Sequence, residues 1–269
     1  MRDIGTQVPE AICELTQTPV AINLLVNREA PPFGDPDIRR AMELAIDRKS
    51  FIDILAEGQG DISGAMLPPP AGLWGLPPEI LQTLPGYGPD VAGNRAEARK
   101  LMEKHGYGAD HRLPVKVATR NIAQYRDPAV ILIDQMKEIY IDGELDAVET
   151  ANWFPKIARK DFMVGANLSG SGVDEPDAYF YEHYACGSER NYTNYCNPEL
   201  EKMYEQQSVE PDQGSARNWS GRSTVGCRRM PPGRSSINTA SGPAATRECM
   251  VSPSWSTASS MAGASTRLG

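Results

Sequence analysis

The chain has 269 residues, 40% of them hydrophobic, with 22 prolines, 24 glycines and five cysteines. This length suits one large domain or two modest ones that can bury a core, and the composition excludes collagen-like and coiled-coil chains. No apolar run approaches the roughly 18 residues needed to cross a bilayer. The formal charge of −8 argues against nucleic acid as a partner, because phosphate binding requires clustered Lys and Arg.

Charge and composition divide the chain into two unequal parts. Residues 1–213 hold 20 basic and 34 acidic residues, whereas residues 214–269 hold seven arginines and one acid, Glu248. This last part has twelve serines and seven glycines but only four residues among Val, Ile, Leu and Phe, too few to bury a core. We expect a disordered basic tail or translation in a shifted reading frame, since GC-rich DNA read out of frame yields Arg, Ser, Gly, Pro and Ala.

The first predicted elements are a strand and three helices. Residues 20–27 (VAINLLVN) form an apolar run of strand length. Asp35-Pro36 predicts a helix to about residue 48, because Asp is a favoured N-cap and Pro fits the first turn. A helix over residues 50–56 follows. Asn94, with a Glu three residues later, resembles a capping box for a helix that ends near residue 105. Between these helices, residues 66–89 indicate a structured loop rich in Pro and Gly.

Strands and helices then alternate along the chain. Residues 113–120 (LPVKVATR) have the period of a strand, Asp127-Pro128 repeats the helix-opening signal, and residues 130–140 are apolar on most faces. This order predicts an α/β fold with right-handed crossovers. A Tyr-rich helix after Pro176 and a helix opened by Asn197-Pro198 come last. The other predicted elements are a strand over residues 145–150, a helix over residues 153–160 and a strand over residues 161–168.

Signatures of catalysis and of cofactor binding are absent. The chain contains no GxxxxGK[ST], GxGxxG, GxSxG or HExxH motif. Its three histidines, His105, His111 and His183, lack metal-ligand spacing, so we expect neither a metal nor a cofactor. The acidic run 174–177 (DEPD) could supply the carboxylate pair of a glycoside hydrolase. Acidic residues beside proline in a turn are more commonly helix caps.

Cys186 and Cys196 enclose nine residues, among them Gly187, Asn191 and Asn194. A loop this short allows a local disulfide, to which chain entropy assigns about 2 to 3 kcal/mol. Such a bond would require an oxidising compartment. Two free buried thiols are the alternative. The polar residues after Met1 contain no apolar stretch of a secretory signal, so we expect a cytosolic protein or a chain whose beginning is missing.

Five stretches of the chain together resemble the family 5 extracellular solute-binding proteins, the peptide/dipeptide/nickel-type periplasmic components of ABC importers. The resemblance covers residues 1–213 in order. Known members are longer, so it implies the later part of such a protein, with the signal sequence before Met1. The stretches are residues 31–53 (PPFGDPDIRRAMELAIDRKSFID), 65–77 (AMLPPPAGLWGLP), 94–108 (NRAEARKLMEKHGYG), 126–139 (RDPAVILIDQMKEI) and 185–208 (ACGSERNYTNYCNPELEKMYEQQS).

The resemblance implies a type II periplasmic-binding-protein architecture with two lobes, of which this chain holds mostly the second lobe and the hinge crossings. Residues 1–28 would end the first lobe and form the first crossing, and residues 29–160 would form the second α/β lobe. Residues 161–213 would form the return crossing and part of the first lobe. Residues 214–269 are expected to be an out-of-frame, disordered tail. Such proteins close over a solute by a hinge motion and deliver it to a permease.

The resemblance also suggests which side chains meet the ligand, since sites between lobes combine an apolar shape with a few polar groups. A Trp in a Pro-rich loop can equally be core packing, and an Arg before Asp-Pro can simply neutralise a helix end. Peptide-binding members often carry an Asp where this chain has Gly172, so a sugar, an opine or another small solute stays possible. The expected contacts are stacking by Trp74, Tyr125 and Trp153, carboxylate binding by Arg120 and Arg126, and amine or hydroxyl binding by Asn167, Ser169, Ser171 and Asp174.

The family comparison further suggests a frameshift near Gln213. With suitable codons for residues 226–239, a frame two nucleotides later reads LQEDAARPILYQH. The same shift turns residues 259–269 into IFNGWRFDEAW, and both strings resemble family sequences at these places. We expect the native gene product to continue in that frame.

The expected function is therefore the binding of a peptide or another small organic solute for import through ABC permease subunits. We expect a monomer, periplasmic in the intact parent, that is not an enzyme. Two alternatives stay open: an autonomous hydrolase-like enzyme on the α/β lobe, and a structural or interaction module with a basic tail. An enzyme would consume its ligand, and an interaction module would protect its tail from proteolysis when the partner is added.

Overall fold

The computed structural model describes residues 11–16, 20–58, 60–64, 66, 72–170, 173–229, 237–238 and 246–251. The chain divides into two units, residues 1–16 with 246–269 and residues 17–245. In the first unit, strand β1 (Ala11–Thr16) pairs antiparallel with β7 (Thr246–Val251). No helix in the described ranges is both long and apolar enough to cross a membrane.

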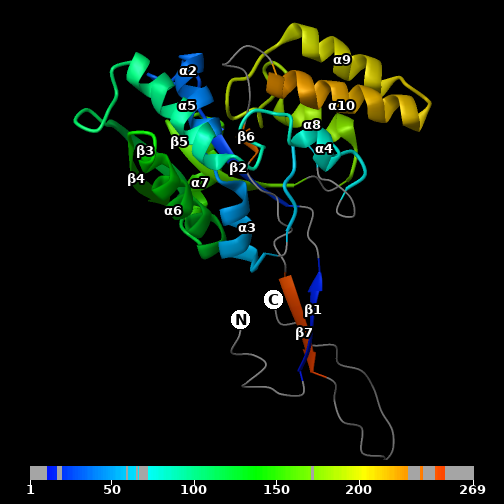
Figure 1. Ribbon diagram of the computed structural model, residues 1–269. Coiled ribbons are helices and arrows are strands. Elements are labelled where there is room, and N and C mark those ends of the chain that lie inside the picture. Colours follow the sequence, from blue (N-terminus) through cyan, green and yellow to red (C-terminus); the bar gives the residue numbers. More distant parts are fainter. Residues whose placement is uncertain are drawn as a thin grey trace, which may run out of the picture. The chain divides into compact units, whose positions relative to one another are not determined.

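The second unit contains the main sheet and the helices, in the alternating order that the sequence predicts (Figure 1). The α/β fold class is thereby confirmed. Its elements are β2 (Ala21–Val26), α2 (Pro36–Ala45), α3 (Arg48–Ala56), α4 (Pro78–Leu81), α5 (Val91–Lys104), β3 (Leu113–Arg120), α6 (Ala123–Lys137), β4 (Ile141–Val148), α7 (Thr150–Ala158), β5 (Val164–Ser169), α8 (Pro176–His183), α9 (Pro198–Ser208), α10 (Gln213–Arg229) and β6 (Ile237–Asn238).

The main sheet has the strand order β4-β3-β5-β2-β6. β3 runs parallel to β4 and β5, whereas β2 runs antiparallel to β5 and β6. The three parallel strands therefore end at one edge of the sheet, where Arg120, Val148 and Ser169 are their last residues. From that edge β3 leads through α6 to β4 on one side, and β5 leads away to α8. Neighbouring strands whose connections leave in opposite directions create the crevice where open α/β sheets bind ligands.

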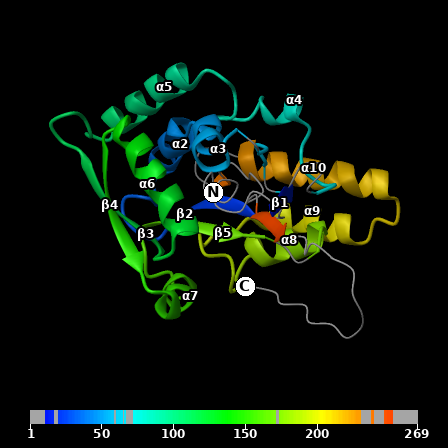
Figure 2. The same ribbon diagram turned by 90° about the horizontal axis from the view of Figure 1, so that it is seen from below.

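Helices cover both faces of the sheet, with α2, α3, α5 and α6 on one side and α7 on the other (Figure 2). Alternate residues of a strand point to opposite faces, and β3 shows the result. Val115 and Val117 pack in the large aliphatic cluster under α2 and α6. Ala118 packs with Trp153 and Ile157 of α7.

Asp residues start the first helices as the sequence predicts, with one correction. The Asp35 Oδ1 accepts a hydrogen bond of 2.8 Å from the Asp37 backbone N–H at the start of α2. For α5 the predicted cap Asn94 is wrong. The helix begins at Val91, because Asp90 accepts a hydrogen bond of 2.9 Å from the Gly93 backbone N–H.

The prediction that Asp127-Pro128 opens a helix is also wrong. α6 begins at Ala123, and Pro128 lies inside it. Its N-cap Ile122 makes no side-chain cap, so packing of the buried face on the sheet, through residues such as Leu132, outweighs the local signal.

Gly143 lies in β4, which begins four residues before the predicted strand. A Cβ added at Gly143 would lie 3.0 Å from Ile133 Cγ1 of α6. The glycine therefore allows this helix to approach the strand closely.

The expectation of a disordered tail from residue 214 is wrong over α10, which lies alongside α9 (Figures 1 and 2). Ala216, Ser220 and Ser223 are buried at helical spacing. The Ser220 Oγ donates to the Ala216 backbone oxygen at 3.0 Å. Small residues on one face let two helices pack closely without large apolar side chains. The frameshift itself stays a prediction.

Candidate functional site

Arg120, the last residue of β3, lies half-buried at the edge where the parallel strands end. Its Nε donates to the Thr150 Oγ1 at 3.1 Å. Its guanidinium carbon lies 5.5 Å from the ring centroid of Tyr125 and 5.9 Å from that of Phe154, a residue that is 49% exposed. Contact with aromatic rings at these distances stabilises a guanidinium and limits its rotation.

Arg126 lies exposed near the start of α6. Its Nη1 donates to the Asn121 Oδ1 at 3.4 Å, and the Asn121 Nδ2 donates to the Glu149 Oε1 at 3.0 Å. Among the described residues, neither Arg120 nor Arg126 forms an ion pair with an acid. The structure therefore places two cations, both suited to carboxylate binding, on consecutive segments of one edge.

Trp153 is not the stacking surface that the sequence predicts. It is fully buried, and its indole Nε1 donates to the Asn167 Oδ1 at 3.2 Å. Its ring meets Tyr125 edge-on, with 6.5 Å between centroids. Because a ring inside the core presents no face to a ligand, this prediction is wrong, whereas the half-buried Tyr125 is still accessible.

Asn167 and Ser169 line a small recess between β2, β5 and α8. Asn167 is opposite Asn23 of β2 in the strand register, and Asn23 donates through its Nδ2 to the Ser169 Oγ. The recess has a volume of about 30 Å³, roughly the space of one water molecule. Asn167 is 5% exposed, so it positions its neighbours more readily than it meets a large ligand.

Three further residues of this recess escaped the sequence analysis, namely His183, Arg190 and Tyr192. They come from α8 and the loop after it, which no local motif connects to the hinge strands. Burial lowers the pKa of His183, so the imidazole is neutral at pH 7. Arg190 pairs with Glu182.

Trp74 and Asp174 interact with each other, across 100 residues of sequence. The Trp74 Nε1 donates to the Asp174 backbone oxygen at 2.9 Å, and the Leu73 backbone N–H donates to the Asp174 Oδ2 at 2.6 Å. Trp74 is 7% exposed and packs in the aromatic cluster of α8, α9 and α10. This packing agrees with the alternative of a core tryptophan, and the predicted stacking on a ligand stays a prediction. Asp174 is exposed, with one carboxylate oxygen used by the loop.

The predicted disulfide between Cys186 and Cys196 is confirmed. Asn191 inside the loop accepts from the Tyr195 backbone N–H at 3.1 Å and donates to the Ala185 backbone oxygen at 3.0 Å. These bonds fix the loop that carries Arg190 and Tyr192. Ser171, the remaining predicted contact, lies outside the described residues.

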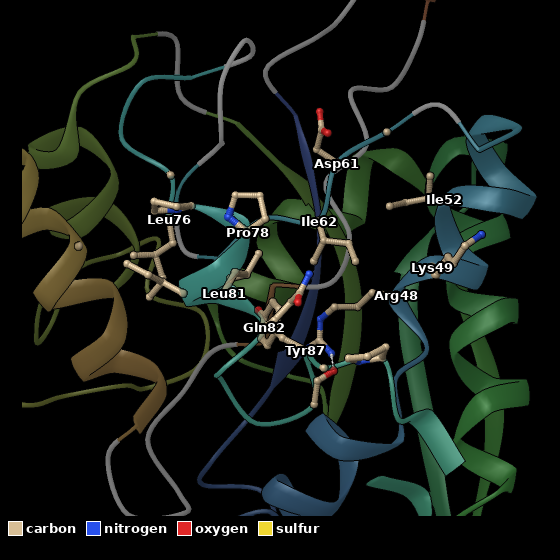
Figure 3. A pocket seen from close by; sticks show the side chains of 18 of the residues that line it. Arg48, Lys49, Ile52, Asp61, Ile62, Leu76, Pro78, Leu81, Gln82 and Tyr87 are labelled. Atoms are coloured by element: carbon tan, nitrogen blue, oxygen red, sulfur yellow. Dashed lines mark hydrogen bonds between the residues drawn. The ribbon is translucent and has the colours of Figure 1, made fainter. Parts of the chain in front are cut away.

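A second, much larger cavity of about 1540 Å³ lies elsewhere, between α3, the loop around α4 and helix α10 (Figure 3). Ile62, Leu76 and Leu81 contribute apolar walls. At its base the buried Arg48 stacks on Tyr87, with 3.8 Å from its guanidinium carbon to the ring centroid. Of the predicted contacts that the structure describes, Trp74 alone lines it. Sequence periodicity alone could not reveal it, because its walls come from distant segments.

Asp35, Asp37 and His105 have ligand atoms within 4.8 Å of one another and could in principle hold a metal ion. The Asp37 Oδ2, however, already accepts from the Lys104 Nζ at 2.7 Å and lies 3.1 Å from the His105 Nε2. These hydrogen bonds lower the pKa of Asp37. The cluster is an ion-pair network between the N-terminus of α2 and the C-terminus of α5, where acids and bases respectively are favoured.

Comparison with known proteins identifies the family. The model described as "Bacterial extracellular solute-binding proteins, family 5 Middle" matches residues 5–191. The chain belongs to this family. The family 5 chain is 26% identical over 216 residues to a probable di/tripeptide-binding protein 5 of Pseudomonas aeruginosa, covering 75% of this chain and 37% of that protein. It is 23% identical over 197 residues to the oligopeptide-binding protein OppA of Bacillus subtilis, covering 69% of this chain and 34% of that protein. It thus spans about a third of the length of these relatives.

Solved structures resemble the family 5 chain over most of its length. The OppA complex of Haemophilus influenzae with the peptide RPPGFSPFR has a TM-score of 0.74 at 19% identity, covering 88% of this chain and 45% of that one. OppA of Burkholderia pseudomallei has a TM-score of 0.75 at 15% identity, covering 93% of this chain and 47% of that one. This likeness shows the fold, which is that of the type II periplasmic binding proteins. The matched relatives are named as binding proteins rather than enzymes.

Proposed function

We propose that this family 5 chain is part of a solute-binding protein that captures a peptide, or another small organic molecule with a carboxylate, for import through ABC permease subunits. The observation that carries the proposal is the pair Arg120 and Arg126, without an acidic partner in the described residues. They lie where parallel strands end, the usual ligand site of open α/β sheets. Relatives named for di/tripeptide and oligopeptide binding support this.

The arrangement suggests how a solute would be held. The guanidinium of Arg120 can meet a carboxylate, and the exposed ring of Phe154 beside it can cover an apolar part of the solute. Asp174, with one oxygen bonded to the loop amide, keeps a second oxygen for an amine, and Ser169 and Ser171 are candidates for hydroxyl contacts. Binding of this kind needs no proton transfer, in contrast to the hydrolase alternative.

We further propose the division into a second lobe over residues 29–160, with crossings at residues 1–28 and 161–213. Strands β3 and β4 with helices α2 to α7 support the lobe, and the antiparallel pair β2 and β5 supports the two crossings. An extracytoplasmic location is supported by the family description and by the Cys186–Cys196 disulfide, since such bonds persist in oxidising compartments. We propose a monomeric binding protein in the periplasm.

Calorimetry of the 269-residue chain tests the proposal, with a dipeptide panel and the same peptides as C-terminal amides. We expect the acids to bind more tightly, and Arg120→Ala to weaken them about tenfold or more, because it removes a charge-assisted hydrogen bond. Arg159→Ala is the matched control, since Arg159 is exposed at the other end of α7. A peptide ligand is refuted if no peptide acid binds, and release of free amino acids would favour the enzyme alternative.

A further inference from the structure

The start of helix α7 contacts Arg120. Thr150 is the first residue of α7, and its Oγ1 accepts the hydrogen bond from the Arg120 Nε. In the part of the chain that the structure describes, the two terminal nitrogens of this guanidinium have no hydrogen-bond partner. A guanidinium bonded at Nε can still offer its two terminal N–H groups as a fork, which matches the two oxygens of a carboxylate.

Rotation of the Arg120 guanidinium is limited from two further directions. The rings of Tyr125, from α6, and Phe154, from the second turn of α7, lie within 6 Å of its central carbon. Together with the bond to Thr150, they hold a long side chain that would otherwise sample many rotamers. Preorganisation of this kind raises affinity by lowering the entropy lost on binding.

Arg126 is held near the start of α7 by a chain of two hydrogen bonds, called the relay below. Glu149, the N-cap residue of α7, accepts from Asn121, and Asn121 accepts from Arg126. The backbone N–H of Asn121 donates to the Val148 oxygen at 2.8 Å, which attaches Asn121 to the end of β4. A neutral amide thus stands between the Glu149 carboxylate and the Arg126 guanidinium. The relay orients this arginine without neutralising it by direct contact.

We infer that Thr150 and Asn121 are positioning residues, which hold Arg120 and Arg126 as a receptor for a free carboxylate and so make the protein prefer an acid over its amide. The inference rests on the proposed function. Neither residue carries a charge or a conspicuous motif. Their role follows from the parallel pairing of β3 and β4, which brings residues 121 and 148–150 to one edge.

The decisive variant is Thr150→Val, which keeps the shape of the side chain and removes the acceptor. We expect the affinity for a dipeptide acid to fall about 3- to 10-fold, the range of one hydrogen bond. The affinity for the dipeptide amide should stay unchanged, and Thr150→Ser should restore the preference. Asn152→Ala, an exposed change in the same turn of α7, is the matched control.

Asn121→Asp tests the relay from Glu149 through Asn121 to Arg126. A carboxylate next to Arg126 would pair with it directly, so we expect a loss of acid binding of similar size that shrinks at high salt. Asn121→Ala should remove the relay without adding charge and should have a smaller effect.

A measurement without ligand tests the positioning itself. The Arg120 Nε–H should give an NMR signal that exchanges slowly with water in the wild type and in Thr150→Ser, and rapidly in Thr150→Val. Unchanged exchange in Thr150→Val would overturn the inference, as would equal losses of acid and amide binding with a lower Tm. If Arg120→Ala weakens acids but Thr150→Val does not, the proposed function stands and the positioning role fails. If the wild type binds no peptide while the exchange pattern holds, the proposed function fails instead.

Discussion

The sheet half of the molecule, β2 to β5 with α2 to α7, and the helical block, α8 to α10, are stabilised by different means. The sheet half buries a continuous aliphatic cluster that includes Leu24, Met42 and Val117. The helical block relies on aromatic contacts, such as the stacked rings of Phe180 and Tyr204, 4.6 Å apart. It adds a disulfide and the inserted Trp74. The sheet half is thus held by strand pairing and aliphatic burial, and the block by aromatic packing and a covalent bond.

The largest expected effect separates the two cores. Phe180→Ala should lower the free energy of unfolding by about 3 to 5 kcal/mol, and Leu24→Ala by about 2 to 5 kcal/mol, because both side chains are buried. Hydrogen exchange measured by mass spectrometry should show Phe180→Ala opening α8 to α10 while β3 and β5 stay protected, and Leu24→Ala opening the sheet. A uniform rise in exchange across both regions would mean that they unfold as one unit.

The disulfide should matter next, and mainly to the helical block. The pair Cys186→Ser and Cys196→Ser should cost about 2 to 3 kcal/mol, because a loop of this length regains chain entropy when it opens. Denaturant unfolding with and without a reductant provides the measurement. The role of the bond is confirmed if the reduced wild type unfolds at the same denaturant concentration as the double variant. It is contradicted if neither the reductant nor the substitutions lower the free energy of unfolding.

A smaller effect is expected where the two regions meet, at the contact between Trp74 and Asp174. Asp174→Ala removes the acceptor of the Leu73 amide and should cost about 1 kcal/mol, since the bond is partly exposed. The exchange rate of the Leu73 amide should rise strongly. Glu175→Ala is the control, because this neighbouring exposed carboxylate makes no cap. Equal effects of the two substitutions would show that Asp174 does not connect the loop to the block.

The smallest effects concern pH, and the two regions should lose stability in different ranges. Burial lowers the pKa of His183 below its ordinary 6.5. The charge of Arg190 also lowers this pKa, whereas the charge of Glu182 raises it, so the unfolded chain binds the proton first. Stability of the block should therefore fall as pH drops below about 6.5. In His183→Gln the free energy of unfolding should depend less on pH between 7 and 5, as denaturant unfolding at each pH will show.

Asp37 of the sheet half also loses its stabilising contribution as pH falls, but in a lower range than His183. Hydrogen bonds from Lys104 and His105 lower its pKa below the ordinary 3.8, so its ionised form stabilises the fold above that value. The contribution is lost as pH falls through the lowered pKa. Asp37→Asn should cost less than about 1 kcal/mol at pH 7, because the pair with Lys104 lies near the surface. A difference in the free energy of unfolding between variant and wild type that stays constant from pH 7 to 2 would contradict this.

Much of the fold could be predicted from local signals, and the limits of these signals are visible in particular residues. Asp35-Pro36 starts α2 and residues 113–120 form β3 as predicted, because capping and side-chain alternation act within a few residues. Pro128 misled the prediction, since packing of α6 on the sheet outweighed a turn signal. α10 was missed because serine and alanine give little apolar signal until a neighbouring helix covers them.

Local sequence patterns were enough to predict the α/β order, the start of α2, a loop short enough for a disulfide and the arginines that follow a strand. Only the tertiary structure decided that Trp74 and Trp153 lie inside the protein. It also decided that Thr150 meets Arg120 across 30 residues, and that Asp174 meets Trp74 across 100. Capping and disulfide loops depend on neighbours along the chain. Contacts at the sheet edge depend on strand order, which results from the burial of both sheet faces together.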